Sequence, residues 1–131
     1  MVRLSRTLYV VLAWAFVVGL TVQVFLIGAG IFGASSSGFD LHAAFGWILH
    51  LFPLLILVFA YLSRGGRLYW GWAAVLALVV FVVPLLATAR TSAPIIAALH
   101  PVVAMISYAI AVIVAVSASR LSQRRDAVQS G

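Results

Sequence analysis

The stretch Asp40–Pro53, DLHAAFGWILHLFP, decides how the rest of the sequence is interpreted. It opens an apolar segment with an aspartate and a histidine, His42, and carries a second histidine, His50, about two helical turns further on. Nearly every side chain between them is hydrocarbon. Such a segment predicts a membrane-spanning helix in which a few polar groups carry whatever chemistry the protein performs.

The composition of the whole chain indicates an integral membrane protein. Of its 131 residues, 66% are hydrophobic and only 8% are charged, which is too little polar surface for a soluble domain. The net charge of +6 comes from arginines that lie between apolar segments and never form a run longer than a pair, so nucleic acid is not an expected partner. The absence of cysteine excludes disulfides, thiolate metal sites and cysteine nucleophiles.

Four apolar segments are each long enough to cross a bilayer, which takes about 20 residues. We predict helices over residues 7–32, 42–62, 68–89 and 99–118. Because the linkers between them are short, neighbouring helices must run antiparallel. The expected fold is all-α: one transmembrane domain over residues 1–131, with four helices in an up-down-up-down bundle, the second and fourth on a diagonal, and a cytoplasmic tail at 119–131.

The distribution of arginine predicts the orientation of this bundle. Seven of the eight arginines lie near the N-terminus, between the second and third spans, or in the C-terminal tail, and only Arg90 lies on the other side. Cytoplasmic segments of membrane proteins are enriched in arginine. We therefore expect a multi-pass protein of the cell membrane, surrounded by lipid, with both termini in the cytoplasm.

Helical periodicity predicts which polar residues face the bundle interior. Small residues recur at steps of three and four below His100 in the fourth span, and similar stripes carry His42 and His50 in the second span and Gln23 in the first. A weak internal repeat, in which Leu-His opens both the second and the fourth span, would place two histidines at equal depth on opposite sides of the bundle axis.

His42 and His100 are accordingly the candidate metal ligands. Two inward imidazoles at equal depth would supply both axial ligands of a haem b near the outer membrane face, with Asp40 orienting one of them. Asp40 is also a good N-cap for the second helix. The alternatives are that both histidines merely begin helices at the interface, which Pro101 favours, or that they hold a non-haem metal.

His50 lies roughly 12 Å deeper than His42 at the rise of an α-helix. We expect it to stay neutral and to form a hydrogen bond with Gln23, which lies at similar depth in the first span. The alternatives are that it ligates a deeper haem or that it contacts a quinone, with Tyr108 as a further hydrogen-bond donor at that depth.

Three functions follow from these residues. The first is a small b-type cytochrome that passes electrons. The second is a non-catalytic structural or accessory subunit that packs against a membrane-protein partner or a second copy of itself. The third is a binder of a lipid-soluble ligand such as a quinone. The sequence leaves open whether the protein is an enzyme, and the absence of acidic residues within the spans argues against a proton-coupled transporter.

Several short motifs resemble a family of small, uncharacterised bacterial four-helix integral membrane proteins. These motifs are Val22-Gln23-Val24-Phe25-Leu26, Phe39-Asp40-Leu41-His42 followed by Gly46-Trp47, and Leu99-His100-Pro101. The resemblance covers nearly the whole chain and implies the four-helix fold and a bacterial inner membrane, but no activity. In that family we would expect a glutamine late in the third span, where this chain has Val83. A more distant likeness to four-helix b-type membrane cytochromes supports haem by analogy only.

Overall fold

The computed structural model describes the backbone of residues 1–129 and the side chains of residues 1–123. The described chain forms helices joined by turns: α1 (Val2–Ile31), α2 (Gly38–Leu49), α3 (Leu51–Leu62), α4 (Arg67–Thr88), α5 (Pro94–Ala97) and α6 (His100–Gln129). Four stretches, 2–31, 38–62, 67–88 and 94–123, are long and apolar enough to cross a membrane. The predicted all-α fold with four segments of membrane-spanning length and composition is confirmed.

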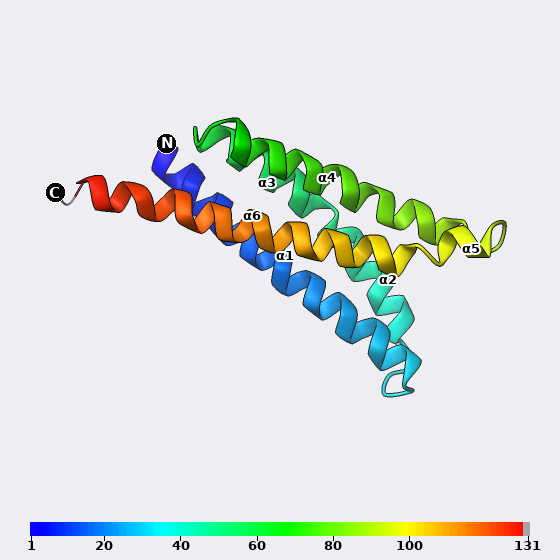
Figure 1. Cartoon of the computed structure of the whole chain (residues 1–131). Helices are drawn as coiled ribbons and strands as arrows, with labels where there is room; N and C mark the ends of the chain where they lie inside the picture. The colour runs from blue at the N-terminus through cyan, green and yellow to red at the C-terminus, as the bar shows by residue number, and fades with distance from the viewer. Residues whose placement is uncertain (130–131) are drawn as a thin grey trace.

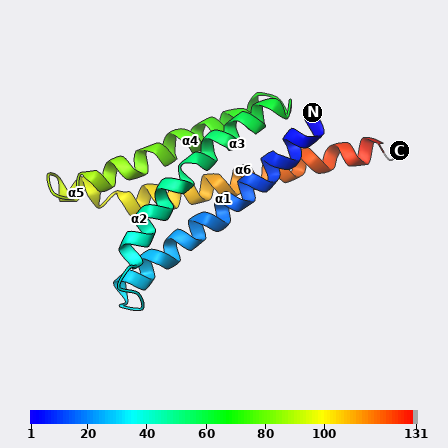
Figure 2. The ribbon, with the colours of Figure 1, turned by 180° about the vertical axis from the view of Figure 1, so that it is seen from behind.

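The second of these spans consists of two helices. α2 ends at Leu49 and α3 begins at Leu51, with His50 in a turn between them. Proline has no N–H to donate, and its ring clashes with the carbonyl four residues earlier. Pro53 therefore interrupts the helix at Leu49. The helix predicted over residues 42–62 is present within the span 38–62, and it has a kink at His50 that the prediction did not include (Figure 2).

The last helix continues beyond its apolar part. α6 extends to Gln129, whereas the sequence predicted an end at residue 118 and a tail from 119 onward. Residues 119–127 contain no glycine or proline, so nothing in them stops a helix when the hydrophobicity falls. Arg124, Arg125 and Asp126, which were expected at a solvated cytoplasmic end, lie outside the described side chains.

The helices form a four-membered ring in cross-section. α1 packs against α6 on one side and against α2 and α3 on the other, while α4 packs against α3 and α6. The second and fourth spans therefore lie on a diagonal, as predicted. The N-terminus, the α3–α4 turn and the C-terminal part of α6 gather at one end, and the α1–α2 and α4–α5 turns lie at the other, where the two hairpins diverge (Figure 1).

The hydrophobic core lies in the half of the bundle nearer the termini. Every long helix contributes to it, and the fully buried side chains include Tyr9, Phe16, Ile56, Leu76 and Val114. The predicted small-residue face of the fourth span is buried as well, at Ser107, Ala111, Ala115 and Ala118. Small side chains here let α6 approach its neighbours closely, so the bundle is closed in this half.

A close backbone contact ties α2 to α1 in the other half. A Cβ atom at Gly38 would lie 2.5 Å from the Gly30 nitrogen and 2.9 Å from the Leu26 oxygen, so a residue other than glycine would push the helices apart. α2 therefore follows α1, whereas α3 packs against both α1 and α4. The break at His50 permits both arrangements, and the hairpins separate beyond it.

Candidate functional site

A cavity of about 680 Å³ lies between the hairpins in the diverging half, and we call it the inter-hairpin cavity. α1, α2, α4 and α6 line it, together with the turn that follows α4. Its volume is within the range of about 300–1,000 Å³ that is typical of small-molecule sites. Of the site residues predicted from the sequence, it brings together His42, His100, His50 and Gln23, and it leaves out Asp40 and Tyr108.

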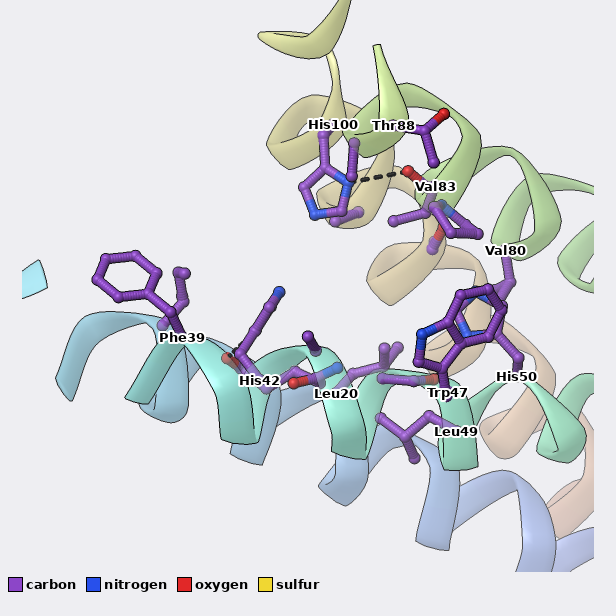
Figure 3. Close-up of a pocket in the computed structure, with 18 of the residues that line it drawn as sticks. Leu20, Phe39, His42, Trp47, Leu49, His50, Val80, Val83, Thr88 and His100 are labelled. Carbon is purple, nitrogen blue, oxygen red and sulfur yellow. Dashed lines mark hydrogen bonds between the residues drawn. The ribbon is translucent and has the colours of Figure 1, made fainter. Parts of the chain in front are cut away.

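His42 on α2 and His100 on α6 face one another across this cavity (Figure 3). Their ring centroids are 6.3 Å apart, and the ring planes meet at 70°. His42 Nδ1 lies 3.1 Å from the Gln23 carbonyl oxygen, and His100 Nδ1 lies 2.9 Å from the Val83 carbonyl oxygen. A carbonyl only accepts, so each Nδ1 carries the proton and each Nε2 keeps its lone pair. Both histidines thus have a free Nε2, the atom that binds metals.

The two histidines repeat one arrangement. Each begins or nearly begins its span, and each donates to a main-chain carbonyl of the preceding span, 19 residues earlier for His42 and 17 for His100. The two hairpins therefore share this type of contact, although the acceptors are two residues out of register with the Leu-His repeat. Gln23 and Val83 both contribute to the contact through the backbone.

Asp40 does not orient His42. It is the third residue of α2, its side chain is exposed, and the N-cap position is held by Ser37. Residues two apart in a helix point to different faces, so the carboxylate of Asp40 does not face the ring of His42. The Gln23 carbonyl takes the role that was predicted for Asp40.

His50 is the C-cap residue of α2, and its side chain donates a hydrogen bond to a main-chain carbonyl of that helix. Its Nδ1 lies 2.6 Å from the Gly46 carbonyl oxygen, and its ring centroid lies 5.7 Å from that of Trp47 and 6.1 Å from that of Phe81. Figure 3 shows Trp47 beside His50 on the side of the cavity away from the facing histidines. This packing fixes the ring with its Nε2 buried.

The predicted hydrogen bond between His50 and Gln23 is wrong. His50 Nε2 and Gln23 Oε1 are both buried and both lack a hydrogen-bond partner. With the proton on Nδ1, Nε2 is an acceptor, and an amide oxygen is an acceptor as well, so the two atoms cannot bond to each other. Two buried acceptors without a donor carry a free-energy cost of about 1–3 kcal/mol each.

Tyr108 lies outside the cavity. Its side chain is 38% exposed, and its hydroxyl lies 3.4 Å from the Thr21 hydroxyl on the surface between α1 and α6. The inward position at this level of α6 belongs to the preceding residue, Ser107, which is buried and lines the cavity. Tyr108, which the quinone alternative used as a further hydrogen-bond donor, therefore does not reach the cavity, whereas Ser107 on the predicted inward face does.

Small residues keep the space near the histidines open. Gly46 and Ala104 lie one turn beyond His42 and His100 and line the cavity. A Cβ atom at Gly46 would lie 2.7 Å from Gln23 Nε2, so the glycine also makes room for the glutamine side chain. The prediction that small residues accompany both histidines on the inward faces is confirmed.

Arg90 is the cavity residue that reasoning from the sequence missed. It follows α4, its side chain is exposed, and it lines the cavity together with Thr88 and Thr91. The signal for it was present, because it is the one arginine that departs from the charge bias used to orient the chain.

Comparison with known protein families gives a match. The model of a family of unknown function, DUF6220, matches residues 23–90, just over half of the chain. The matched segment contains Gln23, His42, His50 and Arg90 and ends before His100. No curated protein and no solved structure matches. By this match, the chain belongs to the DUF6220 family of unknown function.

Proposed function

We propose that the protein is a b-type haem-binding electron-transfer protein, with His42 and His100 as the two axial ligands. The observation that carries the proposal is the pair of facing imidazoles whose Nδ1 atoms are both engaged by main-chain carbonyls. Such hydrogen bonds set the tautomer and hold the ring of a metal-ligating histidine. They leave two Nε2 atoms at one cavity as a matched donor set.

The distance between the two imidazole rings fits a haem iron bound by both histidines. A metal–imidazole bond is about 2.0–2.1 Å long, so imidazoles on opposite sides of one metal ion have ring centres about 6 Å apart. The centroids of His42 and His100 are 6.3 Å apart. The angle of 70° between the rings is compatible with this arrangement, because each ring can rotate about its own metal–nitrogen bond. Ala104 leaves room beside the His100 ring for a flat macrocycle, while the space beside Gly46 holds the Gln23 amide.

When bound, a haem supplies a one-electron redox centre, and its axial ligands help to set the potential. The chain's own residues hold it and exclude water. The Gln23 and Val83 carbonyls keep the imidazoles in place, and apolar side chains from α1, α2 and α4 form most of the cavity wall. Two histidines from different hairpins would also tie the diverging ends together.

The test is the absorption spectrum of detergent-purified protein from haem-replete cells, oxidised and dithionite-reduced. We expect a Soret band and sharp reduced α and β bands, and we expect His42→Ala and His100→Ala each to lose the sharp bands. His50→Ala is the matched control, because His50 Nδ1 bonds within its own helix, and it should keep the wild-type spectrum. A colourless wild-type protein would retire the cytochrome and favour the packing subunit, to be examined by co-purification.

A binder of a lipid-soluble quinol is the second candidate, and a separate observation favours it. The buried acceptors His50 Nε2 and Gln23 Oε1 both line the inter-hairpin cavity and both lack a donor. The two hydroxyls of a quinol would each supply a donor to one of them, and an apolar ring would suit Trp47, which lines the cavity beside His50. This candidate uses His50, which lies away from the facing histidines, together with the side chain of Gln23, and it does not involve Tyr108.

A further inference from the structure

We infer that Arg90 binds the carboxylate groups of the ligand in the inter-hairpin cavity, so that an acidic edge of that ligand faces the diverging end of the bundle. The inference rests on the proposed haem-binding function and adds what the histidines do not define, namely the orientation of the ligand. It concerns a residue that has no other evident task in the described structure.

The position of Arg90 at the diverging end of the bundle indicates a functional role. Among the arginines with described side chains, Arg3, Arg6, Arg64, Arg67 and Arg120 lie at or near the end that holds the N-terminus and the α3–α4 turn. Arg6 there donates from Nε to the Ser63 carbonyl oxygen at 3.0 Å. Arg90 lies at the opposite end, against the charge bias of the chain, which a topological role does not explain.

Arg90 also lacks a counterion within the described residues. Asp40 is the only acidic residue among positions 1–123, and it forms no ion pair with Arg90 and does not line the cavity. The main chain at Arg90 is engaged, since its N–H donates to the Ala87 carbonyl oxygen at 3.4 Å. Arg90 thus lines the cavity with an exposed side chain whose five N–H donors are available to a ligand.

The chemistry of the site specifies the partner. A guanidinium matches a carboxylate in shape and charge and forms paired, charge-assisted hydrogen bonds with it. Haem b is an apolar macrocycle with two carboxylates on one edge. His42 and His100 would hold its centre between the hairpins, and Arg90, with the Thr88 and Thr91 side chains beside it, would hold that edge. A lipid phosphate offers Arg90 similar chemistry, so the experiment must separate the two.

The experiment is a titration of haem-free protein in detergent with ferric haem and with its dimethyl ester, in which both carboxylates are masked. The proteins are the wild type, Arg90→Gln, Arg90→Lys and the matched control Arg67→Gln, which removes the same charge at the other end of α4. Affinity is followed by the Soret band, and ligation by the sharp bands of the reduced form.

We expect Arg90→Gln to bind the diacid about tenfold more weakly than the wild type, the order of effect for losing a charge-assisted hydrogen bond. Its spectrum should be unchanged, because both axial ligands remain. Arg90→Lys should recover part of the affinity, Arg67→Gln should match the wild type, and the dimethyl ester should bind equally to wild type and Arg90→Gln.

The outcomes separate the two proposals. Equal diacid affinity in wild type and Arg90→Gln would overturn the role of Arg90 while leaving the bis-histidine site intact. An equal loss of affinity for haem and for its dimethyl ester in Arg90→Gln would also overturn the role of Arg90, because it would show that the substitution disturbs the cavity in general. Failure of the wild type to bind haem would overturn the proposed function and this inference with it.

Discussion

A main-chain carbonyl determines which nitrogen each cavity histidine presents. His42 and His100 donate from Nδ1 to carbonyls on neighbouring helices, whereas His50 donates to its own helix. Periodicity in the sequence predicted that all three histidines and Gln23 face inward, and they do. It could not predict the acceptors, because every residue has the same carbonyl and only the packing of α1 and α4 selects Gln23 and Val83.

The two unsatisfied acceptors give a prediction at this scale. A hydroquinone with short substituents, such as duroquinol, should raise the thermal midpoint of the purified protein by several degrees at saturating concentration. His50→Leu and Gln23→Leu should each lose most of this protection, since each removes one acceptor for the hydroxyl. The oxidised quinone has no O–H to donate and should protect less.

Tyr108→Phe serves as the control, because its hydroxyl lies on the outer surface near Thr21. Equal protection of the wild type and His50→Leu, or equal protection by quinol and quinone, would exclude the two acceptors as the binding groups. The measurement is differential scanning fluorimetry in detergent with and without the ligand.

A proline shapes the second span. Pro53 breaks the helix at His50, so that α2 follows α1 and α3 packs against both α1 and α4. The proline and the glycines at positions 30 and 38 are visible in the sequence. The sequence does not show that a kink at His50 and a close contact between these glycines occur together. The close contact between Gly30 and Gly38 depends on the path of the turn between α1 and α2, which local sequence rules do not define.

Pro53→Ala is predicted to straighten the second span. Alanine restores the missing N–H and favours a continuous helix, which conflicts with α2 lying against α1. Spin labels at Ser37 and Thr91, in the two turns of the diverging end, should then show a shifted mean distance by pulsed electron resonance. Pro101→Ala is the control, because a proline at the start of α6 interrupts no helical hydrogen bond. Identical distance distributions in Pro53→Ala and the wild type would contradict this account.

At the scale of the whole molecule, charge and packing divide the bundle into two unlike ends. The order of the helices followed from short linkers and apolar length, which is why the diagonal arrangement could be predicted. The divergence of the hairpins could not, since it results from one broken helix and one close glycine contact acting together. The cavity, and with it the place of Arg90, depends on that divergence.

The orientation predicted from arginine can be measured directly. The chain has no cysteine, so a single introduced cysteine is unique. In intact cells of a bacterial host, a membrane-impermeant maleimide should label Ser36→Cys in the α1–α2 turn and should label Ser122→Cys on α6 only after permeabilisation. The reverse pattern would place the termini outside and the cavity toward the cytoplasm.

The uneven distribution of the core has a consequence for dynamics. Because the fully buried side chains lie in the half nearer the termini, the diverging ends of α1, α2, α4 and α6 can open without unfolding the bundle. Amide hydrogen exchange should therefore be fast in those ends and slow around Phe16, Leu76 and Val114. Ligands would enter and leave the cavity sideways between the hairpins when these ends open locally. The rates of entry and exit would therefore not depend on the global stability of the fold.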